Sequence, residues 1–308
     1  MELKHFISIN DLKKEDIDFF LKKAGSMLEL LESKKSVNIC RGKILATLFF
    51  EASTRTRLSF ECAMHRLGGS VIGFADAGSS SVSKGESIAD TIRTVESYSD
   101  IIVMRNPFEG AAKVAANNCS VPIINAGDGG HEHPTQTLLD LFTINKKKKS
   151  LSNLTIGLCG DLKFGRTVHS LAKALSEFKG NTMICIAPHE LQFPEGIRKK
   201  IEDTGTKIIQ TDNLKKAIAR LDVLYVTRIQ KERFVSEKEY LRLKGIYVVD
   251  RKMLEKANKD LIVMHPLPRV DEINPEVDRD SRCVYFQQAF YGVPMRMALL
   301  SVMLKCEK

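Results

Sequence analysis

Residues 44–57 read ILATLFFEASTRTR, and this stretch decides the fold. Residues 44–50 are apolar except for Thr47, which is typical of a strand buried on both faces of a parallel sheet. Residues 51–53 predict a turn. A helix is then expected from Thr54 to Leu67, because two glycines at residues 68–69 end it. The stretch therefore predicts one strand–turn–helix unit.

The same alternation continues on both sides of this unit. Further helices are expected at residues 11–32, 87–98, 134–144, 166–178 and 287–304, the first from apolar residues at helical spacing. Further strands are expected at residues 71–74, 101–104, 121–125, 154–159, 182–187, 207–210, 223–226 and 261–264. Two consecutive arrays of this kind predict an α/β protein with two domains, each a parallel sheet flanked by helices, and a boundary near residues 135–150.

The composition agrees with two globular domains. The chain has 308 residues, 43% hydrophobic and 28% charged, and roughly 150 residues per domain predicts two domains. It contains no stretch of about 18 apolar residues, and its first ten residues have no apolar signal core, so we expect a cytoplasmic protein. The seven cysteines include no Cys-x-x-Cys pair, which predicts neither a zinc site nor a disulfide framework.

The formal charge of +9 is compatible with nucleic acid, with anionic substrates or with a basic surface that aids solubility. The run from Lys146 to Lys149 supplies part of this charge. We expect a solvated linker there, because no aromatic residues are interleaved with it, as a surface that binds single-stranded nucleic acid would need.

The turn after the first strand carries three hydroxyl side chains and two arginines, in the order Ser53, Thr54, Arg55, Thr56 and Arg57. Unpaired N–H groups at a helix start favour a phosphate, and arginine matches phosphate with two parallel hydrogen bonds. An ordinary helix cap with surface arginines is the alternative, and the residues by themselves leave both open.

Other expected strand ends and loops carry similar side chains. They are Lys84 in the serine-rich loop at residues 79–86, Arg105, the run from His131 to Gln136, Arg166 after Gly160-Asp161-Leu162, Arg228 with Gln230, and the turn from His265 to Arg269. Each has a plainer alternative, such as a solvated loop, a structural arginine or a capping histidine. The His-x-His pair is weak evidence for zinc, and G-x-G-x-x-G is absent. Because no nucleophile–base pair occurs, we expect a site that binds several anionic groups and stabilises developing negative charge.

At this point the chain resembles the aspartate/ornithine carbamoyltransferases over nearly its whole length. Residues 49–57 and the His133-Pro134-Thr135-Gln136 run are similar to the two signatures of that superfamily. Residues 160–166, 227–230 and 265–269 are similar to the catalytic chains of the aspartate branch. The Ser-Met-Gly loop and the His-Cys-Leu-Pro turn of the ornithine branch are absent, and two arginines suit a dicarboxylate.

The resemblance implies transfer of a carbamoyl group from carbamoyl phosphate to L-aspartate, an early step of de novo pyrimidine biosynthesis, without metal or cofactor. It implies a carbamoyl-phosphate-binding domain at residues 1–134, on which the C-terminal helix at residues 288–308 packs back, and an aspartate-binding domain at residues 135–287. It also implies a homotrimer with shared sites, and it leaves open whether a separate regulatory chain binds.

The resemblance implies a role for each site residue. Phosphate is bound by Ser53, Thr54, Arg55, Thr56 and Arg105. The carbamoyl oxygen is polarised by Thr56, Arg105 and His133, and its amine is held by Gln136 and by the turn of Pro266, Leu267 and Pro268. Aspartate is held by Arg166, Arg228 and Gln230, while Ser80 and Lys84 act in a neighbouring subunit's site. Catalysis is thereby assigned to Arg55, Thr56, Lys84, Arg105 and His133, and an inter-domain bridge to Glu51 and Arg233.

Two departures from the family pattern matter. The serine run at residues 79–83 leaves the choice between Ser80 and Ser81 open, and Phe164 stands where some relatives have tyrosine. Two rival functions remain. One is an enzyme of the same superfamily with ornithine or another amine as acceptor, and the other is a nucleotide- or nucleic-acid-binding module without turnover.

Overall fold

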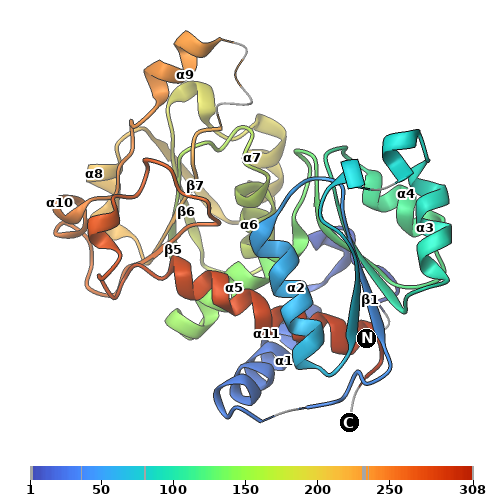
Figure 1. Cartoon of the computed structure of the whole chain (residues 1–308). Coiled ribbons are helices and arrows are strands. Elements are labelled where there is room, and N and C mark those ends of the chain that lie inside the picture. The colour runs from blue at the N-terminus through green and yellow to red at the C-terminus, as the bar shows by residue number, and fades with distance from the viewer. Residues whose placement is uncertain (1–2, 36, 80, 231–233, 235, 307–308) are drawn as a thin grey trace. The chain divides into compact units, whose positions relative to one another are not determined.

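A computed structural model describes residues 3–35, 37–79, 81–230, 234 and 236–306. The chain divides into two compact units, which Figure 1 shows as ribbons. Unit 1 comprises Met1–Phe142 and Ala289–Lys308, and unit 2 comprises Thr143–Gln288. Two long helices, α5 (Pro134–Lys148) and α11 (Tyr285–Met303), contain the points at which the chain passes from one unit to the other.

Unit 1 contains a four-stranded parallel sheet in the order β2-β1-β3-β4. The strands are β1 (Ile44–Phe49), β2 (Ser70–Phe74), β3 (Ile101–Asn106) and β4 (Ile123–Asp128). The three strands β1, β3 and β4 are almost wholly buried, as their apolar runs predict, whereas the edge strand β2 is half-buried or exposed. The strand order reverses between β1 and β3, so the carboxyl ends of these two strands lie at a topological switch point, where α/β proteins bind ligands.

Helices cover the sheet of unit 1, and Figure 1 shows them around it. They are α1 (Lys14–Glu32), α2 (Thr54–Arg66), α3 (Ile88–Glu96), α4 (Ala111–Asn117) and the unit 1 parts of α5 and α11. One core cluster joins β1, β3 and the alanines of α4, which allow that helix to approach the sheet closely.

Unit 2 contains a five-stranded parallel sheet in the order β7-β6-β5-β8-β9. The strands are β5 (Thr155–Cys159), β6 (Thr182–Ile186), β7 (Lys207–Thr211), β8 (Val223–Val226) and β9 (Ile262–Met264). Its helices are α6 (Arg166–Ser176), α7 (Glu195–Glu202), α8 (Leu214–Ala217), α9 (Glu237–Leu243) and α10 (Arg251–Leu254). The switch point of this sheet lies between β5 and β8, whose carboxyl ends lead to Gly160 and Thr227.

The predicted α/β class with two parallel sheets is confirmed. The expectation of a solvated linker at Lys146 to Lys149 is wrong, because α5 continues to Lys148, and the Lys148 ammonium donates a hydrogen bond to the carbonyl of Asp260. Lysines are good helix formers, so the run extends the helix instead of ending it. The helices α4 and α7 to α10 were not predicted.

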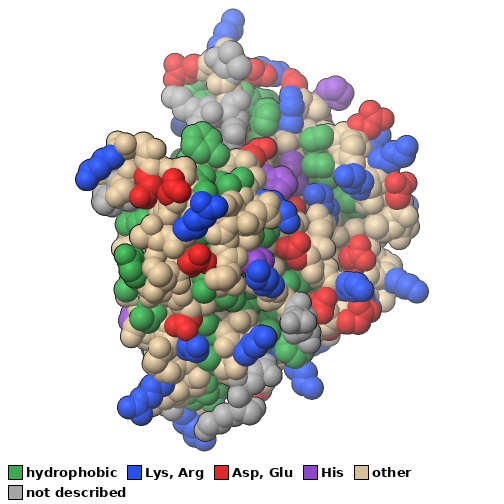
Figure 2. Space-filling view, turned by 90° about the vertical axis from the view of Figure 1, so that its right-hand side faces the viewer, with side chains coloured by type: hydrophobic (Ala, Val, Ile, Leu, Met, Phe, Trp, Pro, Cys, Tyr) green, Lys and Arg blue, Asp and Glu red, His purple; other side chains and the backbone are tan. Residues whose placement is uncertain are grey.

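In Figure 2, Lys and Arg side chains are interspersed with Asp and Glu over the described part of the visible face and form no continuous basic stripe there. All seven cysteines are free, and four of them, Cys40, Cys119, Cys159 and Cys185, are buried. Among the described residues, no helix has both the length and the apolar character needed to cross a bilayer.

Candidate active site

The start of α2 lies directly after the carboxyl end of β1. Ser53 occupies the N-cap position with extended backbone angles, and its side chain accepts no capping hydrogen bond in the described structure. The first turn contains no acidic residue, and it includes Arg55 and Arg57. Arg57 is engaged along the helix by Glu61, with 3.4 Å between Nε and Oε1. The first turn of α2 therefore combines backbone N–H groups that have no partner within the helix with Arg55, which has no carboxylate partner among the described residues of α2. Both features favour the binding of an anion.

Arg105 lies in β3 beside this turn, and its side chain is only 12% exposed. Its Nη1 donates to the carbonyl of Ala126 at 3.3 Å, and its Nη2 lies 3.0 Å from Oε2 of Glu51. The Glu51 contact is an ion pair with poor hydrogen-bond alignment, and among the described residues the buried Nε of Arg105 has no hydrogen-bond partner. A buried donor without a partner costs roughly 1–3 kcal/mol, so this nitrogen is ready for an anionic acceptor.

Arg55 and Arg105 are close enough to repel each other. Burial lowers the pKa of Arg105 against the opposing charge of Glu51, while partial burial and the charge of Arg105 lower the pKa of Arg55. The Arg55 residue as a whole remains exposed, so its charge is only partly desolvated. Two neighbouring guanidinium groups, of which Arg105 also lies next to the carboxylate of Glu51, form a site that a phosphate dianion would stabilise.

His133 joins this group at the start of α5. Its Nε2 lies 3.4 Å from Oγ1 of Thr56, and its Nδ1 lies 3.4 Å from Oγ1 of Thr135. One turn further on, the Nε2 amide of Gln136 donates to Oδ1 of Asp140 at 2.9 Å. This bond fixes the orientation of the Gln136 amide, whose carbonyl oxygen is the group suited to accept from a ligand NH2.

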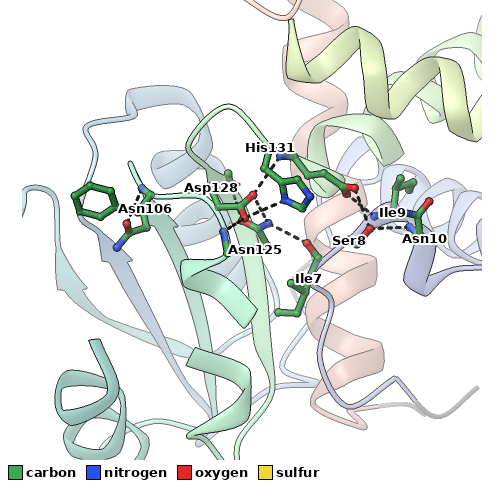
Figure 3. A network of polar contacts seen from close by, with 12 residues as sticks. Ile7, Ser8, Ile9, Asn10, Asn106, Asn125, Asp128 and His131 are labelled. Atoms are coloured by element: carbon green, nitrogen blue, oxygen red, sulfur yellow. Dashed lines mark hydrogen bonds and ion pairs between the residues drawn. The ribbon is translucent and has the colours of Figure 1, made fainter. Parts of the chain in front are cut away.

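A polar network fixes the loop before α5, as Figure 3 shows. The buried carboxylate of Glu132 accepts hydrogen bonds from Ser8 Oγ at 3.0 Å and from the backbone N–H of Ile9 at 2.9 Å. The buried Asp128 accepts through Oδ1 from Asn125 Nδ2 at 3.0 Å and from the N–H of Glu132 at 3.2 Å. The N-terminal segment of the chain thus helps to position the loop through charge-assisted hydrogen bonds.

The two histidines of this loop have different environments. Nδ1 of His131 lies 3.2 Å from Oδ2 of Asp128, which also accepts from the N–H of Gly110 at 3.0 Å, whereas His133 contacts Thr56. In the described part of the chain, no group of three or more His, Cys, Asp or Glu side chains is arranged to hold a metal ion. We did not predict from the sequence that Asp128 and Glu132 position this loop. The signal in the sequence was that two carboxylate residues lie next to the end of a buried strand.

In unit 2, the ends of β5 and β8 are joined by direct contacts. The N–H of Asp161 donates to Thr227 Oγ1 at 3.2 Å, and Gln230 Nε2 lies 3.5 Å from Asp161 Oδ2. Burial raises the pKa of Asp161, although several backbone N–H groups oppose this shift. Arg166 is the first residue of α6, and Arg228 follows β8 closely; both are half-buried. The structure thus brings Gln230 to the Asp161 turn and places both arginines after neighbouring strands of the same sheet.

The turn after β9 contains a cis peptide bond between Leu267 and Pro268. His265 is buried, and its Nε2 donates to Oε1 of Glu272 at 2.7 Å. Its Nδ1 accepts from the N–H of Leu267 at 2.8 Å, so the contacts assign a neutral tautomer protonated at Nε2. His265 therefore fixes the partly exposed turn at Pro266 and Leu267 through its hydrogen bond with the N–H of Leu267.

The serine-rich loop belongs to unit 1. Lys84 ends a short 3₁₀ helix (Ser81–Lys84) and is exposed. Ser80 and Arg233 lie outside the described residues. Within unit 1 the structure therefore brings Arg55, Thr56, Arg105 and His133 together.

Comparison with known proteins agrees with this geometry. Residues 4–146 match the aspartate/ornithine carbamoyltransferase carbamoyl-P binding domain, and residues 152–303 match the Asp/Orn binding domain of the same enzymes. The chain belongs to the aspartate/ornithine carbamoyltransferase family. The first match covers most of unit 1 and the second most of unit 2.

Individual carbamoyltransferases are similar over nearly the full chain. The aspartate carbamoyltransferase catalytic subunit of Thermococcus kodakarensis is 60% identical over 97% of this chain and 96% of its own length. The solved catalytic subunit of M. jannaschii aspartate transcarbamoylase is 51% identical, with a TM-score of 0.93 over 98% of both chains. The Trypanosoma cruzi enzyme, solved with carbamoyl phosphate and aspartate, is 41% identical, with a TM-score of 0.90 over 96% of this chain and 94% of its own. These carbamoyltransferases are all of the aspartate branch.

Proposed function

We propose that this chain is an aspartate carbamoyltransferase, which transfers the carbamoyl group of carbamoyl phosphate to L-aspartate and releases N-carbamoyl-L-aspartate and phosphate. The observation that carries the proposal is the cluster of Arg55, Arg105 and His133 in a chain 60% identical to such an enzyme. The reaction is an early step of de novo pyrimidine biosynthesis, for which a cytoplasmic location is proposed.

Unit 1 is assigned to carbamoyl phosphate. The phosphate binds at the start of α2, to Ser53, Thr54, Arg55 and Thr56, and to Arg105. The Nε of Arg105 has no hydrogen-bond partner in the part of the chain that the structure describes, and the two arginines repel each other. Both observations support this assignment, because a dianion would remove both costs. Thr56, Arg105 and His133 donate to the carbamoyl oxygen, and the side-chain oxygen of Gln136 accepts from the carbamoyl NH2.

Unit 2 is assigned to aspartate. Arg166, Arg228 and Gln230 bind its two carboxylates, because arginine and amide N–H groups match carboxylate oxygens. The turn of Pro266, Leu267 and Pro268 presents backbone carbonyls as acceptors for the carbamoyl amine. The strand-end positions of these residues, on both sides of the β5–β8 switch point and after β9, support the assignment.

The mechanism needs no nucleophilic side chain. The neutral amine of aspartate attacks the carbamoyl carbon, and a C–N bond forms while the carbonyl oxygen becomes an oxyanion. Arg105, His133 and Thr56 stabilise that oxyanion. The C–O bond to the phosphate then breaks, and the leaving phosphate takes the amine proton. Holding both substrates in contact supplies much of the rate, up to roughly 7–11 kcal/mol of the barrier in well-oriented systems.

The decisive experiment measures carbamoyl-aspartate formation by the purified chain from radiolabelled carbamoyl phosphate. Aspartate should be carbamoylated, and an equal concentration of ornithine should be neither carbamoylated nor inhibitory. Ornithine as the preferred acceptor would move the chain to the other branch of the family, and tight binding of carbamoyl phosphate without product would refute the transferase assignment.

We also propose a homotrimer in which Ser80 and Lys84 of one chain complete the site of the next. The exposure of Lys84 and the name "catalytic subunit" carried by close relatives support this proposal. The same name suggests a separate regulatory chain as a partner. Light scattering of the purified chain tests the trimer, and a monomer that is fully active would refute the shared site.

A further inference from the structure

A buried arginine on α11, Arg296, contacts helix α2, whose first turn belongs to the proposed phosphate site. Arg296 is 3% exposed, and its guanidinium carbon lies 4.8 Å from the ring centre of Phe60 in α2. Burial lowers the pKa of Arg296, and the negative charge of Asp140 opposes that shift. Among the described residues, its Nε has no hydrogen-bond partner. Such a group is costly to bury, and apolar residues of similar size often replace buried charges without loss of stability.

The first contact of this guanidinium leads to the phosphate-binding turn. Nη1 of Arg296 donates to Ser59 Oγ at 2.6 Å. Ser59 Oγ in turn lies 2.7 Å from the backbone carbonyl of Arg55 and 3.0 Å from that of Thr56. Because the hydroxyl accepts from the arginine, its own proton is directed to these carbonyls. Arg296 is therefore linked through one side chain, Ser59, and two successive hydrogen bonds to the backbone that carries two of the proposed phosphate ligands.

The second contact leads to the proposed ligand of the carbamoyl amine. The buried carboxylate of Asp140 in α5 interacts electrostatically with Arg296 and accepts a hydrogen bond from Gln136 Nε2 at 2.9 Å. Asp140 thus links the Gln136 amide, through a hydrogen bond, to the charge of Arg296, through electrostatic attraction.

The chain leaves room for this guanidinium one helical turn earlier. A Cβ atom at Gly292 would lie 2.3 Å from Nη1 of Arg296 and 3.4 Å from Leu139 Cδ2. A side chain at residue 292 would therefore displace the group that contacts Ser59. The glycine allows the two functional helices, α2 and α5, to share one cation from α11.

We propose that Arg296 is a positioning residue, which acts through Ser59 and Asp140 to set the Arg55–Thr56 turn and the Gln136 amide in the geometry that binds carbamoyl phosphate. The inference rests on the proposed function and extends it to a residue that touches no substrate. A displacement of about 1 Å at a reacting group can cost roughly a hundredfold in rate. The loss of Arg296 should therefore weaken catalysis although the phosphate ligands themselves remain.

The test compares Arg296→Met, Ser59→Ala and the double variant in the full chain. Arg296→Met should lower kcat/KM for carbamoyl phosphate about tenfold to a hundredfold and leave KM for aspartate within about twofold. Ser59→Ala should lower kcat/KM for carbamoyl phosphate severalfold, and the double variant should be no worse than Arg296→Met. The matched control is Arg282→Met, which removes a partly buried arginine paired with Asp280 in unit 2 and should not change KM for carbamoyl phosphate.

Several outcomes would overturn the proposal. They are additive losses in the double variant, an equal rise of both KM values, or normal kinetics in Arg296→Met. If Arg296→Met does not fold, Ser59→Ala and Gly292→Ala provide the test. Unchanged kcat/KM for carbamoyl phosphate in both variants would refute the positioning role of Arg296.

The binding of inorganic phosphate to the wild type and the variants is measured by calorimetry as a second readout. Weaker phosphate binding by the variants supports the positioning role even if the acceptor is not aspartate, whereas an inactive wild type would count against the proposed function alone.

Discussion

Gly160→Ala is the substitution whose effect follows most directly from the structure. Gly160 directly follows β5 and has a φ of +117°, a conformation that residues with a side chain rarely adopt. A Cβ atom there would lie 2.2 Å from the carbonyl oxygen of Thr227 and 2.8 Å from Thr227 Oγ1. Both atoms belong to Thr227, the residue after β8, whose N–H donates a hydrogen bond to the carbonyl of Cys159 in β5 at 2.8 Å.

The expected loss of stability has two parts. Forcing alanine into the left-handed region costs about 1–2 kcal/mol, and overpacking a close contact costs about 1–3 kcal/mol. Together they predict a loss of about 2–5 kcal/mol. Gly205→Ala is the matched control in the same unit, because Gly205 has φ of +85° but nothing within 4 Å of its Cβ position. Gly205→Ala should therefore lose only the cost of the left-handed backbone conformation, about 1–2 kcal/mol.

The assay combines urea unfolding, followed by circular dichroism, with substrate kinetics. Gly160→Ala should be less stable than Gly205→Ala by about 1–3 kcal/mol, and it should raise KM for aspartate, because the displaced end of β8 carries Arg228 and Gln230. KM for carbamoyl phosphate should not change. Equal losses of stability in the two variants would show that the close contact between a Cβ atom at residue 160 and Thr227 does not contribute to the destabilisation. An unchanged KM for aspartate in a destabilised Gly160→Ala would refute the assignment of this turn to the aspartate site.

Three further outcomes are expected. Arg105→Ala and His133→Ala should each lower the single-turnover rate by about a hundredfold or more, and near-normal rates in both would remove the oxyanion role. Inactive Lys84→Ala and Arg55→Ala chains, when mixed, should regain activity in mixed trimers, and no recovery would argue against shared sites. Burial alone would raise the pKa of Glu272, but its hydrogen bond with a buried histidine and backbone N–H groups lower it below its usual value of 4.5. A carboxylate with a lowered folded-state pKa stabilises the fold above the unfolded pKa and loses that contribution as the pH falls. The free energy of unfolding should therefore decrease as the pH falls below about 4.5, and it should decrease less steeply in Glu272→Gln. Identical acid unfolding profiles of the wild type and this variant would contradict the prediction.

The sequence predicted the fold where apolar runs are long and the turns are marked by glycine. Both ends of β1 and the start of α2 follow from residues 44–57, and the order of strands and helices follows in the same way. The short helices α7 to α10 were missed, because four to eight residues give too little periodicity to recognise. Their starts depend on local contacts, such as the bond from Met253 N–H to Asp250 Oδ1 at 2.7 Å, and α4 was missed because its buried face is made of alanine.

The candidate site was predictable to the extent that topology determines it. Parallel strands place their carboxyl ends at one edge of the sheet, so Arg55 and Arg105 could be expected to meet. The partners that orient the site could not be found in this way. Ser59 and Arg296 are 237 positions apart, and Ser8 and Glu132 are 124 positions apart. Such pairs form only because packing buries polar groups that must then be satisfied, and periodicity contains no information on which groups will meet.

The discontinuous course of unit 1 has a consequence for the order of events during protein synthesis. The proposed phosphate ligands, at residues 53–56 and 105, leave the ribosome early, but α11 contributes to unit 1 only from Ala289 onward. Domains usually fold as units, with the N-terminal one first. Here the first domain to emerge must wait for the last part of the chain, after all of unit 2 has been made. During that interval the face of α2 that Arg296 contacts in the folded protein lacks this partner, so the N-terminal part of unit 1 reaches its final packing only after α11 has been made.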